Sequence, residues 1–588
     1  MLFEKAAEYY EKLEGLSSRL AMIDLLSEML KEAEKDEIRH LIYLTQGVLG
    51  PPFEGIQIGI AEKFAEEAIA MATGYEKEEV RSLYRKKGDM GEVAEELREK
   101  GRLKRMSQEK QNVNELFNEM KKIASTSGTG SQELKIKMLA HMISASSGRG
   151  AKYITRLALG TLRLGLGDAT ILEALSKMAT GERKLKDELE NAYNICSDLG
   201  KVGEVLAKNG VKGIEEFKVE IFNPIRPALA ERLPTSEEIL DKMGGRCAVE
   251  SKYDGMRAQV HIDREKKRVE IFSRNLERIT DMFPEIAKAV LTDLNAKSAI
   301  IEGEAIAYDE ISDEFFPFQE TIQRKRKHGI KEKSEEIPLH LFAFDLMYLN
   351  GEDYLEKSFS DRREELGKIV TSNRIRLTDM IIAKSPKELD SYFNNAVGEG
   401  LEGIMAKDLS SRYIAGARKF SWIKMKRSYK GQLSDTLDLV IIGYFLGRGS
   451  RAEFGFGGLL SAVYNKKRDM FESVTKIGTG FTEEQMKFFK EKLHRITLQK
   501  KPARVDSDII PDFWTEPIYV VTVRADEITR SPTHICGKRE DKEELGYALR
   551  FPRLVSDGIR EDKSAEDATT TKEVIEMFEQ QKKTKVKD

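Results

Sequence analysis

The stretch Cys247-Ala-Val-Glu-Ser-Lys-Tyr-Asp-Gly-Met-Arg257 decides the fold class of this chain. A strand-like run ends at Lys252, the turn-prone pair Asp254-Gly255 comes next, and a second strand-like run, MRAQVHID, begins. The fixed letters Lys-x-Asp-Gly occur by chance in roughly one chain in ten of this length, and a surface lysine before a turn would also produce them. The interpretation therefore depends on the residues downstream of Arg257.

A series of short motifs is present in order along the rest of the chain. They are Arg274 in FSRN, Glu302-Gly303-Glu304, Phe344-Asp345, Glu402-Gly403 with Lys407, Trp422-Ile-Lys424-Met-Lys426, and Arg560-Glu-Asp-Lys563. If WIKMK is a strand, Lys424 and Lys426 lie on one face, because side chains alternate along a strand. Two neighbouring ammonium groups are costly to hold together unless an anion lies between them.

This ordered series resembles the motifs of the covalent nucleotidyltransferases, which include DNA ligases, RNA ligases and mRNA capping enzymes. The resemblance is closest to the ATP-dependent DNA ligases of the archaeal and eukaryotic replicative type, and it covers essentially the whole chain. Those ligases have a helical domain before the catalytic core, a P-x-x-P-A-L-A linker, found here at Pro224 to Ala230, and an OB-fold after the core.

The resemblance implies that Lys252 attacks the α-phosphate of ATP, the substrate, and forms a lysyl–AMP intermediate that leads to the sealing of nicked duplex DNA. The residues implied to hold the nucleotide are Glu250 at the adenine, Phe344 stacked on the base, Arg257, Arg274 and Glu304 at ribose and phosphate, and Lys424 and Lys426 at the α-phosphate. Arg560 and Lys563 would orient the pyrophosphate, and Glu402 would help to bind the catalytic metal.

The chemistry asks for the same residue types. A lysine with an ordinary pKa of about 10.4 is protonated at neutral pH and cannot attack phosphorus. Lys424, Lys426 and a bound cation favour the neutral amine and also stabilise charge on the phosphoryl oxygens. Glu304 and Glu402 offer hard oxygen ligands that suit Mg²⁺, with Mn²⁺ as an alternative.

Three domains are predicted from changes in hydrophobic periodicity along the sequence. Residues 1–218 have helical periodicity and predict an all-α domain, and residues 219–430 mix strands and helices, which predicts an α+β domain. The resemblance implies that the first is a DNA-binding domain and the second an adenylation domain. Residues 431–588 contain short strands with one helical insert, as in a β-barrel OB-fold, and end in a helix. The proline-punctuated segment 222–234 reads as a linker.

Composition narrows the class of protein without naming it. Apolar residues make up 40% and charged residues 34%, and no apolar run approaches the ~20 residues that span a bilayer. The first residues lack a signal-peptide core, so we expect a cytoplasmic protein, and we expect a monomer. The three cysteines share no C-x-x-C spacing, which excludes a four-cysteine zinc module built within this chain. The net charge of −3 neither supports nor excludes DNA.

Other nucleotide enzymes fit less well. The chain has no G-x-x-x-x-G-K-[ST], so a P-loop ATPase is disfavoured. The helical part of roughly 218 residues argues against capping enzymes and simple RNA ligases, and the absent zinc finger argues against NAD⁺-dependent ligases. A non-catalytic nucleic-acid scaffold of the same fold remains the alternative from another class.

Several segments have two interpretations. The run 156–175, with Arg156 and Arg163, is either a tight helix–helix contact with solvated arginines or a turn that clasps phosphates. The basic run 323–333 is a solvated segment or a DNA contact. Arg448 and Arg451, in a glycine-rich turn, either contact a phosphate or are solvated. The segment 108–117 is a candidate docking motif for a sliding clamp, but it lacks the paired aromatics.

Single residues also have a plain structural interpretation when they are taken outside the series. Glu402 and Lys407 would then be solvated strand ends, and Phe344 would belong to the core. Asp345 and Trp422 are expected to be structural even within the series.

Overall fold

The computed structural model describes residues 1–102, 111–309, 314–315, 321, 324, 330, 334, 337–371, 373–399, 401–426, 436–447, 454–478, 481–525, 527–538, 545–555 and 558–583. Two compact units divide the chain. The first comprises Met1–Ala230, Gly255–Thr378 and Asp408–Trp422, and the second comprises Glu231–Asp254, Asp379–Lys407 and Ile423–Asp588. The predicted range 219–430 thus contributes to both units.

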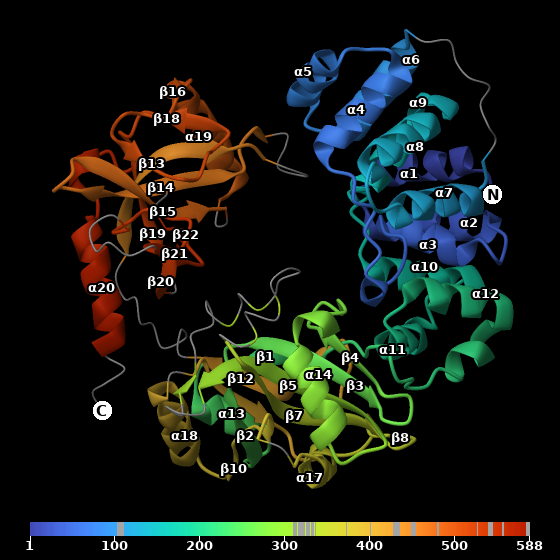
Figure 1. Ribbon diagram of the computed structural model, residues 1–588, viewed down its shortest axis with the longest axis vertical. Helices are drawn as coiled ribbons and strands as arrows, with labels where there is room; N and C mark the ends of the chain where they lie inside the picture. The colour runs from blue at the N-terminus through green and yellow to red at the C-terminus, as the bar shows by residue number, and fades with distance from the viewer. Residues whose placement is uncertain are drawn as a thin grey trace. The chain divides into compact units, whose positions relative to one another are not determined.

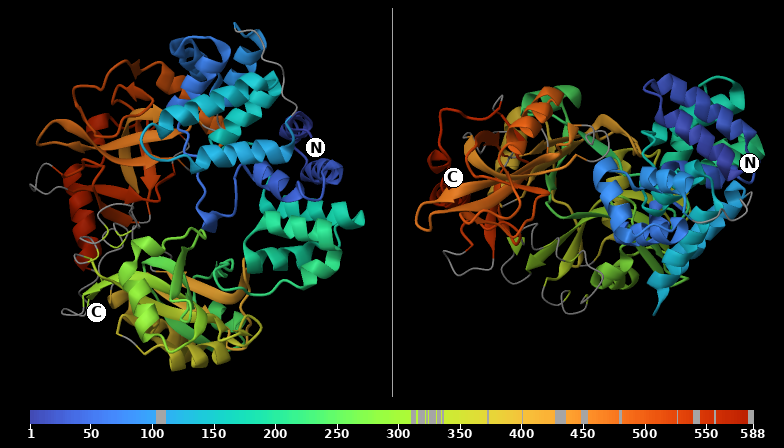
Figure 2. Two further views of the ribbon diagram at one scale, coloured as in Figure 1. Left: turned by 45° about the vertical axis from the view of Figure 1, so that its right-hand side comes forward. Right: turned by 90° about the horizontal axis from the view of Figure 1, so that it is seen from above.

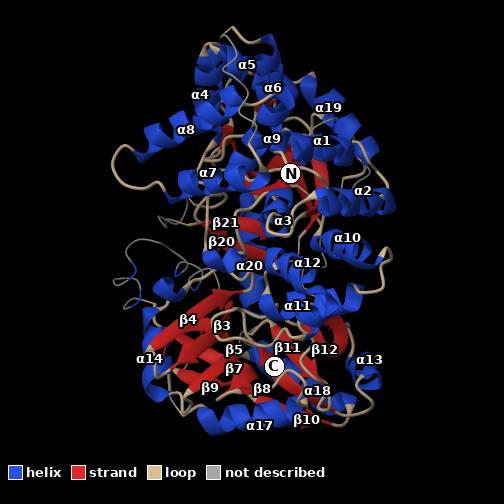
Figure 3. Cartoon of the chain, turned by 90° about the vertical axis from the view of Figure 1, so that its right-hand side faces the viewer, coloured by secondary structure: helices blue, strands red, loops and turns tan. Residues whose placement is uncertain are grey.

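The N-terminal part of the first unit is helical (Figure 1). Its helices are α1 (Phe3–Glu14), α2 (Arg19–Glu32), α3 (Ile38–Gln46), α4 (Glu62–Thr73), α5 (Lys77–Lys87), α6 (Met90–Lys100), α7 (Val113–Ser125), α8 (Ser131–Ala145), α9 (Gly148–Ala158), α10 (Asp168–Thr180), α11 (Lys186–Cys196) and α12 (Leu199–Glu215). Figure 3 draws α1 to α12 as helices, in blue. The helical periodicity of the sequence is confirmed.

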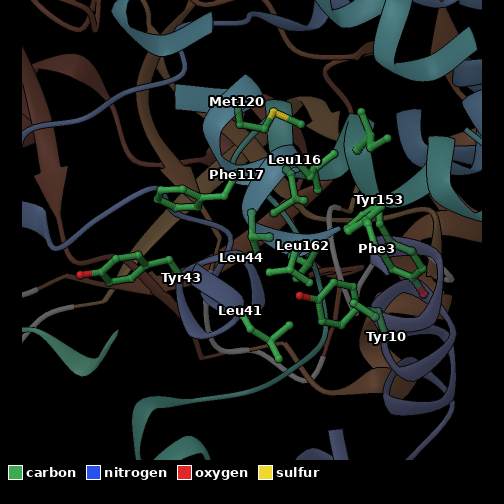
Figure 4. Close-up of a cluster of buried hydrophobic side chains, with 14 of the residues drawn as sticks. Phe3, Tyr10, Leu41, Tyr43, Leu44, Leu116, Phe117, Met120, Tyr153 and Leu162 are labelled. Atoms are coloured by element: carbon green, nitrogen blue, oxygen red, sulfur yellow. The ribbon is translucent and has the colours of Figure 1, made fainter. Parts of the chain in front are cut away.

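One apolar core joins these helices. Leu41 and Leu44 of α3, Leu116 and Phe117 of α7, and Tyr153 of α9 are all buried in it (Figure 4). Leu116 and Phe117 belong to the candidate clamp segment, whose first residues, 108–110, lie outside the described residues. The apolar side chains of that segment therefore pack inside the helical part and are not presented to a partner.

Arg156 is buried, which corrects the expectation of a solvated arginine. It is 3% exposed and pairs with Asp89 and Glu14, each at 3.0 Å, and Arg163 also pairs with Asp89. The tight helix contact exists, but Gly91 of α6 provides it: a Cβ there would lie 2.7 Å from the Arg156 Cγ. Gly160, in the run itself, has open space around its Cα.

A seven-stranded sheet forms the rest of the first unit, in the order β4-β3-β5-β7-β8, with β6 on β5 and β9 on β7. The strands are β3 (Met256–Asp263), β4 (Arg268–Ser273), β5 (Ser298–Asp309), β6 (Glu314–Phe315), β7 (Leu339–Leu349), β8 (Glu352–Asp353) and β9 (Ile375–Leu377). Helices α14 (Pro284–Asp293) and α17 (Phe359–Ile369) pack on it through Ile286, Val290 and Leu366.

A second sheet has the order β1-β12-β11-β2-β10. Its strands are β1 (Leu229–Arg232), β2 (Cys247–Lys252), β10 (Met380–Ala383), β11 (Gly403–Lys407) and β12 (Arg418–Lys426). Helix α18 (Pro386–Gly398) contacts β2, β10 and β11, and α13 (Ser236–Lys242) contacts α18. Because β1 lies within the predicted linker 222–234, that linker is shorter than expected.

The C-terminal residues are rich in strands. An eight-stranded sheet has the order β16-β18-β13-β14-β15-β17, with β19 on β13 and β22 on β19, and β20 pairs with β21. The strands are β13 (Leu437–Phe445), β14 (Gly458–Asn465), β15 (Met470–Ile477), β16 (Thr497–Leu498), β17 (Val505–Asp506), β18 (Phe513–Thr515), β19 (Val520–Arg524), β20 (Glu527–Ser531), β21 (Gly546–Arg550) and β22 (Arg553–Leu554).

Helix α19 (Glu483–His494) packs on these strands, and the terminal helix α20 (Thr571–Lys583), red in Figure 2, lies beside β14 and β20. Residues 448–453, with Arg448 and Arg451, lie outside the described residues. No helix in the described part of the chain is long and apolar enough to span a membrane.

Two buried arginines anchor the first unit. Arg362 and Asp345 are both fully buried and pair at 2.6 Å, so Asp345 has a structural partner, as expected. Arg324 is also buried and pairs with Glu285 at 2.6 Å. The solvated interpretation of the run 323–333 is therefore wrong at Arg324, and residues 323, 325–329 and 331–333 of that run lie outside the described residues.

Arg362→Ala should lower the free energy of unfolding of the sheet by about 3–5 kcal/mol, because it leaves the Asp345 carboxylate buried and unpaired. The chain has two tryptophans, Trp422 and Trp514. In a Trp514→Phe background, the fluorescence of the buried Trp422 during urea unfolding reports the core alone.

Arg412→Ala is the matched control, because Arg412 pairs with Glu356 on the surface at 3.0 Å and should contribute less than about 1 kcal/mol. Equal losses in the two variants would contradict the assignment of a buried anchor.

Candidate active site

Lys252 is the last residue of β2 and faces β11 in an antiparallel pairing. Lys252 lies opposite Gly403, and Glu250 lies opposite Met405. The backbone N–H of Glu402 donates to the carbonyl of Lys252 at 3.0 Å. Side chains two residues apart on a strand share a face, so Glu250 and Lys252 project on the same side.

The Glu402 carboxylate lies between two lysines. Its Oε2 pairs with the Nζ of Lys252 and its Oε1 with the Nζ of Lys426, and all three side chains are 21–25% exposed. Lys426 of WIKMK thus has an acidic neighbour, and an anion between Lys424 and Lys426 stays a prediction. The expectation of a merely solvated strand end, for Glu402 taken alone, is wrong.

Gly403 explains the Glu-Gly pattern. A Cβ on Gly403 would collide with the backbone carbonyl oxygen of Met425 on β12. A glycine at this position therefore lets β12 approach β11 closely enough for Lys426 to reach Glu402. Gly255 has a similar role in Lys-x-Asp-Gly, since a Cβ there would lie 2.6 Å from the carbonyl oxygen of Ala305 on β5.

Charge holds Glu402 ionised. Burial alone would raise the pKa of its carboxyl, but the ammonium groups of Lys252 and Lys426 outweigh burial and lower the pKa below its ordinary value. Nearby, burial and then the charge of Glu402 raise the pKa of Asp254.

Glu250 forms a second ion pair on the same strand pair. Its Oε2 lies 2.7 Å from the Nζ of Lys407, and the two side chains are 2% and 1% exposed. Lys407 is thus not the solvated strand end that the residue suggests when taken alone. The pair fixes the Glu250 carboxylate in place, because an isolated charge at this depth would be strongly unfavourable.

Arg257 on β3 belongs to a separate cluster in the first unit. Its guanidinium forms two hydrogen bonds to Glu302, at 3.0 and 2.7 Å, and one to the carbonyl of Ala228 at 2.8 Å. The Tyr413 hydroxyl donates to Glu302 at 2.8 Å. Burial would lower the pKa of Arg257, but Glu302 raises it, so the group stays charged.

Aromatic rings surround this guanidinium. Arg257 lies 5.5 Å from the ring centroid of Phe344 and 5.6 Å from that of Trp422. The Phe344 and Trp422 rings meet edge to face at 5.9 Å. Trp422 is buried and Phe344 half-buried, so Trp422 packs as a structural residue and Phe344 retains an accessible surface.

The other predicted nucleotide residues occupy varied positions. Glu304 pairs in register with Arg257 across β3 and β5 and is half-buried. Arg274 follows β4 and is exposed, in the wall of a hollow of about 410 Å³. Lys424 is half-buried on the same face of β12 as Lys426.

Arg560 and Lys563 share an acidic partner within the C-terminal part. Lys563 Nζ lies 2.6 Å from Asp438 Oδ2, and Arg560 Nη1 lies 3.4 Å from Asp438 Oδ1. Arg560 also pairs with Asp562 at 2.6 Å and holds the pKa of that carboxyl at about 2. Both cations are thus brought together, about one-third exposed.

Known proteins match this chain along most of its length. Three family descriptions match: "DNA ligase N terminus" over residues 2–176, "ATP dependent DNA ligase domain" over 227–426, and "ATP dependent DNA ligase C terminal region" over 452–563. A probable DNA ligase of Dictyoglomus turgidum is 46% identical, covering 100% of this chain and 99% of the relative. A DNA ligase of Saccharolobus solfataricus is 42% identical, covering 100% and 98%.

The chain belongs to the ATP-dependent DNA ligase family. A solved structure titled "Pmar-Lig_PreS3" matches with a TM-score of 0.55 at 16% identity, covering 94% of this chain and 98% of that one, which supports the fold alone. The chain is therefore an enzyme that joins DNA and uses ATP as substrate, as its family and named relatives establish.

Three residues that contact predicted site residues, or their partners, were not themselves predicted as site residues: Glu302, Lys407 and Tyr413. Glu302 and Lys407 stand inside the quoted motifs. Their opposite charge to the predicted site residues Arg257 and Glu250, with which they form buried ion pairs, was the signal that could have identified them. Tyr413 lies outside every motif, and only the fold brings its hydroxyl to Glu302. Among the described residues, no group of three or more His, Cys, Asp or Glu side chains gathers to hold a metal.

Glu402→Gln should lower the free energy of unfolding at neutral pH by about 1–3 kcal/mol, because the charged hydrogen bonds to two lysines are lost. Because the pKa of Glu402 is lower in the folded protein, its charge stabilises the fold at pH values above the ordinary glutamate pKa of ~4.3. This stabilisation disappears as the pH falls through the lowered pKa. The gap between wild type and variant should therefore close in acid.

Urea unfolding from pH 7 to pH 3, followed by Trp422 fluorescence in the Trp514→Phe background, measures this gap. A gap that does not change with pH would contradict the role of the Glu402 charge.

Proposed function

We propose that Lys252 carries AMP in this ligase and that the enzyme seals nicks with a 3′-hydroxyl and a 5′-phosphate in replication, repair and recombination. The observation that carries the proposal is the position of Lys252, at the end of β2 and paired with a carboxylate that also binds Lys426. A structural lysine would need one counter-charge, whereas this one shares its carboxylate with a second ammonium group.

The first transfer joins the Lys252 Nζ to the α-phosphorus of ATP. The ammonium first gives a proton to solvent, because only the neutral amine can attack phosphorus. A P–N bond then forms as the P–O bond to pyrophosphate breaks, and the proton released from nitrogen passes to solvent.

Two further transfers complete the reaction. An oxygen of the DNA 5′-phosphate attacks the AMP phosphorus, and the P–N bond to Lys252 breaks as the departing nitrogen takes up a proton from solvent. The 3′-hydroxyl then attacks the 5′-phosphorus, loses its proton, and expels AMP. Lys426 and Lys424 would stabilise negative charge on the transferring phosphoryl groups.

The remaining site residues have proposed roles that agree with their contacts. Glu250, fixed by Lys407, would accept a hydrogen bond from the adenine amino group, and the accessible face of Phe344 would stack on the base. Arg257, Arg274 and Glu304 would contact ribose and phosphate. Because Glu302 already binds two nitrogens of Arg257, few donors of that guanidinium are left for a ligand.

Glu402, with Glu304, would hold Mg²⁺ or Mn²⁺. The fit rests on hard carboxylate oxygens and on a lowered pKa that keeps Glu402 charged. When bound, the ion neutralises charge on the phosphate oxygens. Mg²⁺ commonly uses only one or two carboxylates and completes its shell with substrate phosphates and water.

We further propose three functional domains: a DNA-binding domain (1–218), an adenylation domain (219–430) and an OB-fold domain (431–588). Three consecutive antiparallel strands, β13 to β15, are followed by α19 and by β19, which returns beside β13, and this supports an OB-fold. The protein would act as a cytoplasmic monomer on nicked duplex DNA. The burial of Leu116 and Phe117 does not favour a sliding clamp docked on the segment 108–117.

Lys252→Ala should abolish the AMP adduct and all ATP-driven sealing, because no neighbouring lysine can replace its nitrogen without moving the reacting atoms off line. It should retain weakened sealing of a nick that already carries 5′-AMP, since that step needs no lysyl–AMP. Intact-mass and peptide mass spectrometry after incubation with ATP measure the adduct and its position.

Lys368→Ala, a loss of the same charge from an exposed ion pair, is the control and should adenylate normally. A label on Lys407, Lys424 or any residue other than Lys252 would refute the mechanism, and the absence of any adduct would favour the scaffold alternative.

Arg560→Ala and Lys563→Ala should each slow self-adenylation on the order of tenfold or more and leave sealing of a pre-adenylated nick much less affected. The reason is that their proposed ligand, pyrophosphate, leaves in the first step only. Single-turnover rates of the two reactions provide the comparison.

Arg504→Ala removes a half-buried arginine of the same C-terminal part, paired with Glu566 at 2.8 Å, and should change neither rate. Equal losses in both reactions for Arg560→Ala would remove the step-specific role.

A further inference from the structure

The segment Phe222–Ala228 is bound along one face of β3. Arg257, Gln259 and His261 occupy alternate positions of β3 and therefore share a face. Each of the three binds the backbone of the segment: His261 at Phe222, Gln259 at Ile225 and Arg257 at Ala228. We call residues 222–228 the strap.

Two of these contacts are buried amide interactions. The Gln259 side chain accepts a hydrogen bond from the Ile225 N–H at 2.7 Å and donates one to the Ile225 carbonyl at 2.9 Å. Both residues are almost completely buried. Gln259 thus replaces the strand that would otherwise satisfy these backbone groups.

His261 binds the strap as a neutral ring. The Phe222 N–H donates to its Nδ1 at 3.0 Å, and its Nε2 lies 2.9 Å from the Oε1 of Gln259. Burial lowers the pKa of His261 to about 3, so Nδ1 keeps the lone pair that accepts this bond. The contact persists throughout the neutral range.

The third contact involves both backbone groups of Ala228. Its carbonyl accepts from Arg257 at 2.8 Å, and its N–H donates to the Tyr413 hydroxyl at 2.9 Å. The bound residues 222, 225 and 228 are three apart, and Pro224 and Pro227 lie between them. From Pro224 on, a spacing of three with prolines fits a polyproline II segment, which presents one face every third residue, whereas Phe222 has a φ of +75° and lies in the preceding turn.

Arg226 belongs to the strap but binds the helical part of the same unit. Its guanidinium lies 3.3 Å from the Asp168 carboxylate and 4.4 Å from the ring centroid of Tyr193. Its backbone N–H donates to the Asn194 carbonyl at 2.8 Å. Asp168 begins α10, and Tyr193 and Asn194 lie in α11, so one strap residue joins two helices.

The core completes this junction at Gly416. The Gly416 N–H donates to the carbonyl of Arg226 at 3.1 Å. A Cβ on Gly416 would collide with the side chain of Asn194, and its φ of +67° also favours glycine. Helical part, strap and core therefore meet at Arg226.

We propose that Arg226 is a positioning residue. It fixes the helical part on the nucleotidyltransferase core through Asp168 and Tyr193, and in this way it orients the helical part for binding nicked DNA. The strap holds the backbone of Arg226 on β3, so its side chain transmits a fixed orientation. This inference rests on the proposed function only in that the helical part supplies DNA affinity. It assigns Arg226 no contact with ATP or the reacting atoms.

The test separates orientation from chemistry. Arg226→Ala should raise the nick concentration needed for half-maximal sealing on the order of three- to tenfold, the combined effect of a partly exposed ion pair and a cation–π contact. The self-adenylation rate and the sealing rate at saturating nick should stay within about twofold of wild type, since the chemistry is unaltered.

A distance measurement gives a second readout. Spin labels on cysteines placed at the exposed residues Glu188 of α11 and Glu364 of α17 report the helical part and the core. The distance distribution should broaden in Arg226→Ala. Arg412→Ala, which removes an exposed arginine paired with Glu356, is the matched control and should leave the distribution and the KM for nicked DNA unchanged.

Asp168→Asn serves as the second variant, because the charge is lost while the amide oxygen still accepts one of the two hydrogen bonds, that from Tyr193 to Oδ2 or that from Gln46 to Oδ1. The double variant Arg226→Ala/Asp168→Asn should have the same KM for nicked DNA as Arg226→Ala alone, as expected for two partners of one contact. An unchanged KM with an unchanged distance distribution would overturn the proposal. A fall in self-adenylation equal to the fall in sealing would also overturn it, whereas an inactive wild type would instead count against the proposed function.

Discussion

Strands β2, β11 and β12 depend on one electrostatic constraint: a single carboxylate, Glu402, holds two ammonium groups that would otherwise repel each other. The backbone makes this possible, because Gly403 has no Cβ and lets β12 come close to β11. The motif Glu402-Gly403 therefore meets two requirements at adjacent positions: Glu402 supplies the negative charge, and Gly403 leaves space for the backbone of β12. Loss of the Glu402 carboxylate would separate Lys252 from Lys426 because the attraction is lost. A larger residue at Gly403 would separate them because its Cβ collides with β12.

The same pairing of charges recurs in three further pairs of the described residues. Glu250 is matched by Lys407, Arg257 by Glu302, and Arg362 by Asp345. Burial of an unmatched charge is very costly, so each pair is a condition of the fold as well as a feature of the site. The pairs near the proposed nucleotide residues also limit motion, since a carboxylate with a fixed partner presents its remaining lone pairs in a fixed direction.

Much of this could be predicted from the sequence, and the failures have physical causes. Strand and helix runs follow hydrophobic periodicity, which is local, and the motif series indicated the residues around Lys252. Burial of a charged residue is not local: Lys407 and Arg156 look like surface residues until their partners, far away in the chain, are known. Tyr413 reaches Glu302 only through the fold. The roles of the site residues in catalysis stay predictions.

The strap changes what the sequence between two folded regions can tolerate. Connecting segments usually accept insertions and deletions, because their length is set only by the span they must cover. Here the residues 222, 225 and 228 must each meet a particular side chain of β3, and Arg226 must still reach α10 and α11. Adding or removing a single residue would move every later contact out of phase. In this ligase the number of residues between helix and sheet is therefore as constrained as their identity, and variation should accumulate by substitution rather than by change of length.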